Sequence, residues 1–337
     1  MELIPTNSGR IFDCVHINKQ PALDHPLLKN HKLQRKPSFK RKNNQTSVKN
    51  SRNLIHWLEH VRCPKRTVPI QRLTKDDLIR GKSVLKVHNQ GVIIHQAHVL
   101  HGVVDNIHGI KGTTSIYNLK LNNNQSSTGH LFLQNKVIGA ATNRIIVGWH
   151  VSPKLYRDDH STYFYALWTS DNFKSTGCYD MLCKGFVQTD RSYYLGSRIR
   201  RTSTYGGEMI EMPISLNKDR ISHNWWLTVA DKTIGYFPAA IFSDMVKVSG
   251  GWGGVTRTPE GTSSPPMGSG HLPDKNFVHA SYFRDVGIQV DHSEKYHQPN
   301  IIEDNNDNFN CYGINYYGDQ GEEFGYSLQF GGPGCNK

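Results

Sequence analysis

Two stretches decide the fold, Arg144-Ile145-Ile146-Val147-Gly148-Trp149-His150-Val151 and Thr162-Tyr163-Phe164-Tyr165-Ala166-Leu167-Trp168. Both are short runs rich in β-branched and aromatic residues, which is typical of β-strands. From about residue 92 onward, similar runs alternate with turn signals, and no long helical period separates them. This pattern indicates an antiparallel β-sandwich or barrel. The further strands that we expect cover residues 209–216, 225–229, 277–283 and 287–290.

In the first 91 residues the pattern of expected elements is different from that of the rest of the chain. Residues 10–15 and 63–73 look extended. Thr74-Lys75-Asp76-Asp77 has the pattern of a capping box and predicts a short helix, whose length Gly81 limits. We therefore divide the chain into an N-terminal pro-segment, residues 1–91, with short strands and one helix, and a mainly β domain, residues 92–337.

The net charge of +12 is concentrated in one segment. Between Lys29 and Lys86 there are 17 Lys and Arg residues against three acidic residues. Residues 29–53 are rich in Lys, Asn and Ser, and we predict a solvated basic linker there. The blocks Arg35-Lys36 and Lys40-Arg41-Lys42 also fit a nuclear signal or an RNA-binding arm. Because no RRM, KH or zinc-finger pattern accompanies them, we expect no nucleic-acid partner.

The six cysteines are even in number, which fits three disulfides with 15 possible pairings. We predict the local pairings Cys14–Cys63, Cys178–Cys183 and Cys311–Cys335. Two sequons, at Asn44 and Asn124, are candidate glycosylation sites. Together these features indicate an oxidising, secretory compartment.

The start of the chain, Met1-Glu2-Leu3-Ile4-Pro5-Thr6, lacks the apolar core of a signal peptide. Either the protein stays inside the cell or the sequence lacks its first exon, and the cysteines favour the second interpretation. No run of 18 apolar residues is present, so we expect no membrane partner.

Most motifs of familiar catalytic chemistry are absent from the sequence. It contains no His-Glu-x-x-His zinc motif, no Gly-x-Ser-x-Gly elbow and no phosphate-binding loop, so we expect neither a metal nor a cofactor. Met267-Gly268-Ser269-Gly270-His271 places a Ser near a His, but adjacency in sequence does not set the geometry of a catalytic triad. We interpret the glycine-rich residues 250–254 as a tight strand edge.

Several tryptophans fall on the predicted strands or their edges. On the face of a sandwich, such a residue is either part of the core or a stacking platform for a sugar or a peptide proline. The residues that we consider as candidates for lining a cleft are Trp149, Trp168, Tyr205, Trp252 and His271.

Long ordered motifs give the chain a family resemblance. Residues 13–31 and 63–70 resemble the activation peptide of plant neprosin-like proteins. The stretches that resemble the neprosin domain are residues 148–156, 177–188, 224–227, 235–238, 252–254 and 267–271.

The resemblance implies a secreted plant pro-protein, extracellular or vacuolar, whose C-terminal domain is an antiparallel β-sandwich. It also implies a glutamic endopeptidase that cleaves after proline at acidic pH. The basic N-terminal segment then becomes a pro-segment, removed from the domain or held over its cleft. The expected partners are this pro-segment and either a peptide, for example a proline-rich one, or a cell-wall polysaccharide.

That activity needs two carboxyl groups on facing strands, one to activate water and one to protonate or stabilise the carbonyl oxygen. In the family, one Glu stands two residues before the Gly-Trp pair and the other follows Trp-Gly-Gly. In this chain those positions hold Ile146 and Val255, neither of which transfers a proton. We predict a pseudo-peptidase in which these two side chains face each other across a cleft.

Two alternatives stay open. An acid endopeptidase with displaced carboxylates would use Glu208, Glu211 or Glu260. A carbohydrate-binding sandwich of lectin type would use the same fold without peptidase chemistry. Peptide hydrolysis at low pH separates the first alternative from the others.

Overall fold

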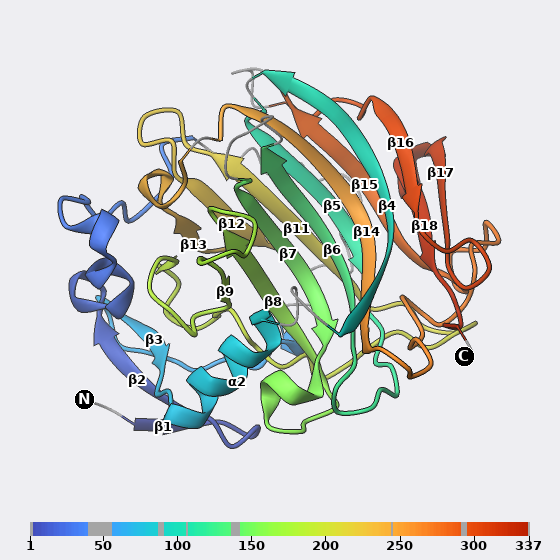
Figure 1. The fold of residues 1–337 in the computed structure, drawn as a ribbon. Helices are drawn as coiled ribbons and strands as arrows, with labels where there is room; N and C mark the ends of the chain where they lie inside the picture. The colour runs from blue at the N-terminus through green and yellow to red at the C-terminus, as the bar shows by residue number, and fades with distance from the viewer. Residues whose placement is uncertain are drawn as a thin grey trace.

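The computed structural model describes residues 3–39, 56–86, 91–105, 107–135, 142–243, 245–290 and 295–335. Two large antiparallel sheets lie face to face in this part of the chain (Figure 1), which confirms the predicted mainly β, antiparallel fold. The seven-stranded sheet runs in the order β16 (Ile301–Asn306), β4 (Val92–Asp105), β14 (Lys247–Pro259), β6 (Ser126–Asn135), β7 (Arg144–Val151), β8 (Thr162–Thr169) and β9 (Cys178–Tyr179). The eight-stranded sheet runs in the order β10 (Val187–Gln188), β13 (Lys232–Phe237), β12 (Trp225–Val229), β11 (Glu211–Lys218), β5 (Gly109–Ser115), β15 (Ser281–Gln289), β18 (Tyr326–Gly331) and β17 (Gly313–Asp319).

The strands follow the sequence pattern with one clear exception. β7 and β12 have the predicted bounds, and β11 is shifted by two residues. The prediction of separate strands at 277–283 and 287–290 is wrong, because β15 runs through Ser281–Gln289. Its register shifts between Arg284 and Gly287, where Asp285 has a φ of 49°. This β-bulge interrupts the alternation and makes one strand look like two.

The core fills the space between the two sheets, because successive side chains on a strand point to opposite faces. On β7, Ile145, Val147 and Trp149 are fully buried in this core. Trp252 joins them from β14, and Trp225 joins them from the opposite sheet. The aromatic residues that drew attention in the sequence therefore hold the two sheets together.

β14 lies in the middle of its sheet, between β4 and β6, so the interpretation of residues 250–254 as a strand edge is wrong. Its glycines stand where atoms of the neighbouring strands on both sides come close to the backbone. A Cβ added at Gly253 would lie 2.0 Å from the carbonyl oxygen of Ala97, and the φ of Gly253 is +150°. A Cβ at Gly251 would lie 2.7 Å from the ring of Phe132. The glycines thus allow the neighbouring strands and side chains to approach the backbone of β14.

Residues 3–39 and 56–86, here called the N-terminal unit, pack beside the sandwich (Figure 1). Their three-stranded sheet has the order β1-β2-β3, and α2 follows it. None of the helices among the described residues has the length and apolar character needed to cross a membrane. The elements of the unit are β1 (Leu3–Pro5), β2 (Ile11–His16), the 3-10 turns η1 (Ile17–Lys19), η2 (Pro21–Asp24) and η3 (Pro26–Leu28), β3 (Thr67–Gln71) and α2 (Lys75–Lys86). The short helices of the domain are η4 (Pro153–Tyr156), η5 (Ala239–Ile241) and α3 (Gly321–Phe324).

Helix α2 begins at the predicted capping box. The backbone N–H of Thr74 donates to Asp77 Oδ2 at 2.8 Å, and the N–H of Asp77 donates to Thr74 Oγ1 at 3.2 Å. The prediction that Gly81 limits the helix is wrong, because α2 continues to Lys86. Gly81 instead makes room for a neighbour, since a Cβ there would lie 2.9 Å from Leu182 Cδ1.

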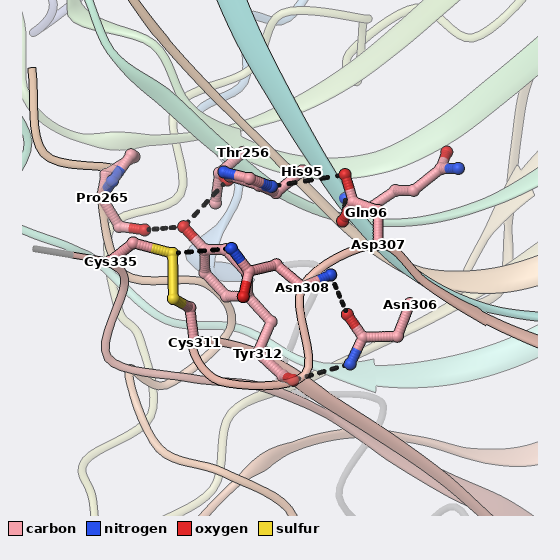
Figure 2. The surroundings of a disulfide bond; sticks show 10 residues. All are labelled: His95, Gln96, Thr256, Pro265, Asn306, Asp307, Asn308, Cys311, Tyr312 and Cys335. Carbon is pink, nitrogen blue, oxygen red and sulfur yellow. Dashed lines mark hydrogen bonds and ion pairs between the residues drawn. A yellow bond between two sulfur atoms is a disulfide. The ribbon is translucent and has the colours of Figure 1, made fainter. Parts of the chain in front are cut away.

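The six cysteines form the disulfides Cys14–Cys63, Cys178–Cys183 and Cys311–Cys335, the same three pairings that we expected from the sequence. Figure 2 shows the last of these beside Asn308, whose side-chain amide contacts the Cys335 sulfur. The bond ties the C-terminal end of the described chain to the turn before β17.

The first part of the predicted basic linker is packed against the eight-stranded sheet. Leu33 and Phe39 pack with Trp226 and Tyr236 in one apolar cluster. Gln34 Oε1 accepts hydrogen bonds from Trp226 Nε1 at 3.3 Å and from the amide of Asn224 at 3.0 Å. The prediction of a solvated linker is therefore wrong for residues up to 39. Residues 40–53, with Lys40-Arg41-Lys42 and the sequon at Asn44, lie outside the described residues.

Candidate functional site

The outer face of the seven-stranded sheet is the surface that its strands turn away from the core. Because side chains alternate, this face carries the residues that stand between the inward ones on each strand. The residues on its central part are His98 from β4, Thr128, His130 and Phe132 from β6, Ile146, Gly148 and His150 from β7, Tyr165 and Leu167 from β8, and Gly251, Gly253 and Val255 from β14.

Ile146 and Val255 both lie on the outer face, but they do not stand opposite each other. Across β6, Ile146 is in register with Gly251, which is four residues before Val255. At about 3.3 Å per residue and about 4.8 Å per strand, this offset separates the two Cα atoms by about 16 Å. Our expectation that the two side chains face each other is therefore wrong. The alternation of side chains along each strand determines that both residues lie on the outer face. The distance between them along the strands depends on how β6, β7 and β14 pair.

His130 occupies the middle of the diagonal between Ile146 and Val255. It pairs with Gly148 on β7 and with Gly253 on β14, and each of these glycines is two residues from one of the two positions. A Cβ at Gly148 would lie 2.8 Å from His130 Cβ, so the glycine leaves space for the imidazole. An imidazole therefore stands between the positions of Ile146 and Val255.

His130 belongs to a buried network of imidazoles and hydroxyl groups. Its Nε2 lies 3.2 Å from Nε2 of His98. Its Nδ1 lies 2.9 Å from Thr128 Oγ1 and 3.1 Å from the Tyr165 hydroxyl. The ring of His150 stacks on that of Tyr165, with ring centres 4.1 Å apart. None of these contacts to the three histidines is made directly by a carboxylate.

Burial and nearby cations keep the three histidines uncharged. Burial lowers the pKa of His98 and the pKa of His150 to about 3, and it lowers the pKa of His130 well below its ordinary value. The guanidinium groups of Arg144 and Arg257 add to the effect on His130. At pH 4 to 7 the three imidazoles are therefore neutral, and the guanidinium groups of Arg144 and Arg257 lie near them on the same face. Among the described residues, no cluster of three or more His, Cys, Asp or Glu side chains is arranged to hold a metal ion.

One carboxyl group, that of Asp180, connects to this network through the hydroxyl of Tyr156. The Tyr156 hydroxyl donates to Asp180 Oδ2 at 2.6 Å, and it therefore accepts from His150 Nε2 at 2.8 Å. Burial raises the pKa of Asp180 to about 7, although the hydrogen bonds from Tyr156 and Ala166 act against the shift. Asp180 is only 4% exposed, so a substrate on the outer face does not reach it.

Helix α2 of the N-terminal unit covers part of the outer face. Val84 belongs to the same buried cluster as Ile146, Leu167 and Tyr179, and Leu85 packs against that cluster. Figure 1 shows the helix beside β9. The N-terminal unit therefore occupies the side of the face on which Ile146 lies.

In addition to this apolar packing, the carboxylate of Asp77 links α2 to the domain. Asp77 accepts from Arg157 Nη2 at 2.7 Å and from Arg80 Nη2 at 2.8 Å, in addition to its role in the capping box. Although burial alone would raise the pKa of Asp77, the hydrogen bonds from Arg157, Thr74 and Arg80 hold it well below its usual range.

We expect Asp77→Ala to release α2 from the outer face. The change removes a helix cap and a partly exposed ion pair, which together contribute about 2 kcal/mol. Limited proteolysis would then cut residues 72–91 faster than in the unchanged protein. The neighbouring exposed Asp76→Ala is the matched control, and equal cutting rates for the two variants would contradict this role of Asp77.

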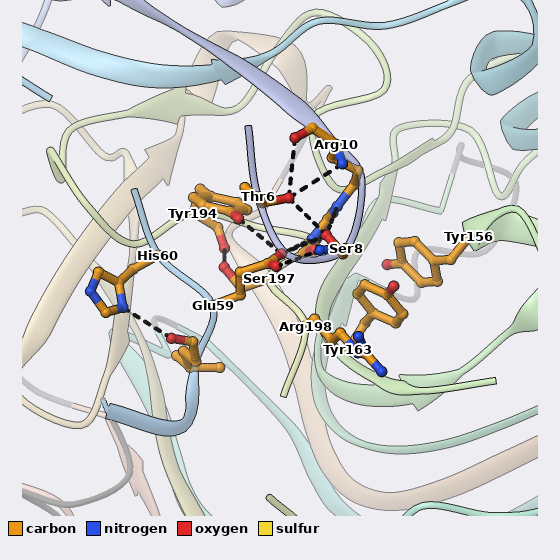
Figure 3. Close-up of polar contacts among 12 residues, drawn as sticks. Thr6, Ser8, Arg10, Glu59, His60, Tyr156, Tyr163, Tyr194, Ser197 and Arg198 are labelled. Carbon is orange, nitrogen blue, oxygen red and sulfur yellow. Dashed lines mark hydrogen bonds and ion pairs between the residues drawn. The ribbon is translucent and has the colours of Figure 1, made fainter. Parts of the chain in front are cut away.

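A second contact, shown in Figure 3, anchors the start of the N-terminal unit in the domain. Arg10 forms a buried ion pair with Glu59 at 2.7 Å, and its Nη1 donates to the carbonyl of Gly196. Its guanidinium lies 5.2 Å from the ring centre of Tyr163, and Glu59 also accepts from the Tyr194 hydroxyl. Because Arg10 and Glu59 both belong to the N-terminal unit, their ion pair stabilises the unit itself, whereas the bonds to Gly196 and Tyr194 join the unit to the domain.

Comparison with known protein families agrees with this two-part architecture. Residues 123–333 match the Neprosin family, and residues 3–108 match the Neprosin activation peptide. The chain belongs to the neprosin family. The N-terminal unit and β4 fall within the activation-peptide match, and the rest of the sandwich falls mostly within the neprosin match.

The solved structures to which this neprosin-family chain is similar include two peptidases. One is a scytalido-glutamic peptidase with a peptide-based transition-state analog, at 8% identity over 72% of this chain and 98% of that chain, with a TM-score of 0.40. The other is SCP-B, a member of the eqolisin family of peptidases in a complex with the tripeptide Ala-Ile-His. It has 9% identity over 71% of this chain and 96% of that chain, with a TM-score of 0.33.

The tryptophans that we considered as cleft-lining residues lie in the core of the neprosin domain. Trp149, Trp168 and Trp252 are buried in the main cluster between the sheets. The indole N–H of Trp252 donates to the carbonyl of Lys111 at 2.9 Å. The cleft interpretation is wrong for all three, because each stands at an inward position of its strand.

Tyr205 and His271 lie at the surface, away from the outer face. Tyr205 is 48% exposed, and its ring stacks between His271 and His279 with centre distances of 3.9 Å and 4.7 Å. These rings come from loops next to the eight-stranded sheet, so they do not line the same surface as Ile146. The sequon residue Asn124 is exposed in the loop before β6.

The three acids that we considered as displaced catalytic carboxylates lie elsewhere. Glu211 lies on β11 of the other sheet, where it binds Arg284 and accepts from the Tyr282 hydroxyl at 2.6 Å. Glu208 pairs with Arg201, and Glu260 is exposed in the turn after β14. The structure brings none of these three to the outer face.

Sequence reasoning missed the histidine network. The 18 histidines look scattered along the chain, and His98, His130 and His150 are far apart in sequence. The signal was present in the alternation, since His150 and Ile146 share a face on one strand. Only the pairing of β4, β14, β6 and β7 brings the three rings together.

Proposed function

We propose that this chain is a non-hydrolytic member of the neprosin family that binds peptide on its outer face. One observation carries the proposal: β6, β7, β8 and β14, the strands at the centre of the site, contain no Asp or Glu. A glutamic peptidase needs two carboxyl groups that exchange protons with water and with the substrate. Ile146 and Val255 supply neither.

The groups that replace the carboxylates support binding without hydrolysis. His130, His98 and His150 are neutral and already engaged with one another or with hydroxyl groups. A neutral imidazole with a strongly lowered pKa is a poor general base, and its remaining N–H is too weakly acidic to serve as a general acid. The face can therefore donate and accept hydrogen bonds without driving the cleavage of a peptide bond.

A peptide is the ligand that the face fits best, because it already holds a polypeptide segment of the chain itself. Val84 and Leu85 of α2 pack on a surface made of aromatic and aliphatic side chains. A peptide with apolar side chains would use the same surface once α2 has moved away. The alternative of an active acid endopeptidase finds no support, since Asp180 is buried and the other candidate acids lie elsewhere.

The compartment follows from the cysteines. Three disulfides join all six cysteines, and such bonds persist in oxidising compartments. We therefore propose that the protein is secreted, in agreement with the expectation from the family resemblance.

The test is peptide binding to the variant with a released helix. A fluorescein-labelled proline-containing peptide should bind the full-chain Asp77→Ala variant more tightly than the unchanged protein, as measured by fluorescence polarisation. Adding Ile146→Arg should remove this gain, because it places a charge on the face. Adding Ile221→Arg instead is the control. Ile221 is 81% exposed and lies between β11 and β12 of the eight-stranded sheet, away from the outer face. Equal binding by all variants would refute peptide recognition on this face.

A further inference from the structure

The outer face carries a guanidinium group whose charge has no counter-ion among the described residues. Arg144 begins β7 and stands two residues before Ile146, so its side chain points to the outer face. Its Nε atom is enclosed by protein atoms and has no hydrogen-bond partner in the described part of the chain. The residue as a whole is only partly buried, so a ligand on the face can approach it.

The electrostatic surroundings of Arg144 are unfavourable. Burial and the nearby charge of Arg257 lower the pKa of Arg144 to about 10, and no carboxylate of the described chain acts against this shift. The group still carries its charge at pH 4 to 7. By contrast, the buried guanidinium of Arg10 has the carboxylate of Glu59 at 2.7 Å. Because buried charges in proteins are as a rule paired, an unpaired one points to a partner that comes from outside.

The side chain of Arg144 reaches toward the histidine network. After burial, its charge is a further cause of the lowered pKa of His98 and of His130, so the guanidinium lies near both rings. Neutral imidazoles cannot balance a positive charge. From the opposite end of the same face, Arg257 reaches the Tyr179 hydroxyl at 3.0 Å. Long basic side chains therefore extend over the middle of the face from both ends of its strands.

A carboxylate is the group that fits Arg144 best. The planar guanidinium offers parallel N–H donors in the geometry that a carboxylate accepts with its two oxygens. The next outward side chains on three neighbouring strands are Phe132, Ile146 and Leu167, which pack in one apolar cluster. A single negative charge balances Arg144, whereas a phosphate dianion would bring a second charge into these apolar surroundings. The ligand is therefore apolar apart from one acidic group.

We propose that Arg144 binds a carboxylate of the peptide on the outer face, either the C-terminal carboxylate or that of an Asp or Glu side chain. This inference rests on the proposed peptide binding and adds to it the charge and the place of one ligand group. The guanidinium donates two hydrogen bonds to the carboxylate, and apolar side chains of the peptide lie on the cluster with Ile146. Arg144 is a binding residue and takes no part in proton transfer.

The experiment measures peptide binding by isothermal titration calorimetry at pH 6, where a peptide carboxylate is ionised. The protein is the full-chain Asp77→Ala variant, and the peptides are unlabelled, N-acetylated and proline-containing. One pair, without acidic side chains, differs in a C-terminal acid or amide, and the other pair, both amidated, differs in one Glu or Gln. The charged member of at least one pair should bind about tenfold more tightly or better, and the pair that differs identifies the source of the carboxylate.

Two added changes locate the effect. Adding Arg144→Gln should abolish the preference for the charged peptide. Adding Arg191→Gln is the matched control, because it removes an arginine from an exposed position in the loop after β10 and should keep the preference. Equal binding within both pairs, or a preference that survives Arg144→Gln, would overturn the role of Arg144 and leave the proposed function standing. Absence of binding by all four peptides would overturn both.

Thermal unfolding without peptide provides a second check. Arg144→Gln should melt at or above the temperature of the Asp77→Ala parent, because it removes a charge that the protein itself does not balance. A clearly lower melting temperature would show that the guanidinium is already paired within the protein, and it would overturn the proposal.

Discussion

Acidification from pH 7 to pH 4.5 is expected to lower the free energy of unfolding by about 5 kcal/mol. The cause is the buried network of His98, His130 and His150, in which burial keeps the pKa of each ring far below its ordinary value of 6.5. In the unfolded chain these rings take up protons as the pH falls below about 6.5, whereas in the folded protein they do not. The unfolded state therefore gains stability, by about 3 kcal/mol per ring at pH 4.5.

One group acts in the opposite direction. Because burial raises the pKa of Asp180 to about 7, the folded state binds a proton that the unfolded state releases. Asp180 therefore favours folding as the pH falls from 7 toward 3.8, by about 3 kcal/mol at pH 4.5. The three histidines outweigh it. The acids with lowered pKa values, such as Asp77 and Asp219, titrate only below this window.

Urea unfolding at pH 7 and at pH 4.5 measures the effect. In His98→Gln/His130→Gln the loss of stability between the two pH values should be much smaller, because the amides do not titrate. His223→Gln is the control, since His223 is exposed and its replacement should leave the pH dependence unchanged. Stability that stays constant or rises on acidification would show that the three rings are not held neutral.

Gly148→Ala is expected to destabilise the domain by about 3 kcal/mol or more, because it forces two central strands apart. A Cβ at this position would lie 2.1 Å from the carbonyl oxygen of Gly129 and 2.6 Å from His130 Cα. Both atoms belong to the backbone of β6, so no side-chain rotation relieves the overlap. The change would also displace His130 from His98.

Thermal unfolding of the full chain checks this prediction, and Gly207→Ala provides the comparison. The nearest atom to a Cβ at Gly207 is Thr204 Cβ at 3.4 Å, an ordinary contact, so this variant should melt close to the unchanged protein. If Gly148→Ala melted at the same temperature as Gly207→Ala, β6 and β7 would not approach each other as described.

Local patterns in the sequence predicted those features that depend on neighbouring residues. The capping box at Thr74 and Asp77 forms as expected, because its two partners are three residues apart. The strands at 144–151 and 225–229 have the predicted bounds, because alternation and β-branched residues act within each strand. The mainly β fold and the family resemblance were accessible for the same reason.

Features that depend on contacts between residues far apart in the sequence could not be predicted from the sequence. Alternation on β7 shows that Trp149 and Ile146 point to opposite faces, but not which face is the core, so Trp149 was considered for the cleft. The docking of Leu33 and Phe39 on Trp226 was missed, because a polar local composition resembles a linker until its partner is known. The histidine network and the offset between Ile146 and Val255 arise from strand pairing alone.

The most direct measurement is hydrolysis of a quenched proline-containing peptide by the full chain and by Asp77→Ala, from about pH 2 to 7. Circular dichroism at each pH shows where the protein remains folded. A glutamic peptidase run in parallel proves that the substrate can be cut. Our proposal that Ile146 and Val255 stand in place of the two catalytic carboxylates predicts no turnover by either form at any pH at which it is folded. Turnover by the folded protein, in particular turnover that Asp77→Ala increases, would contradict the account and place a working catalytic group on the outer face.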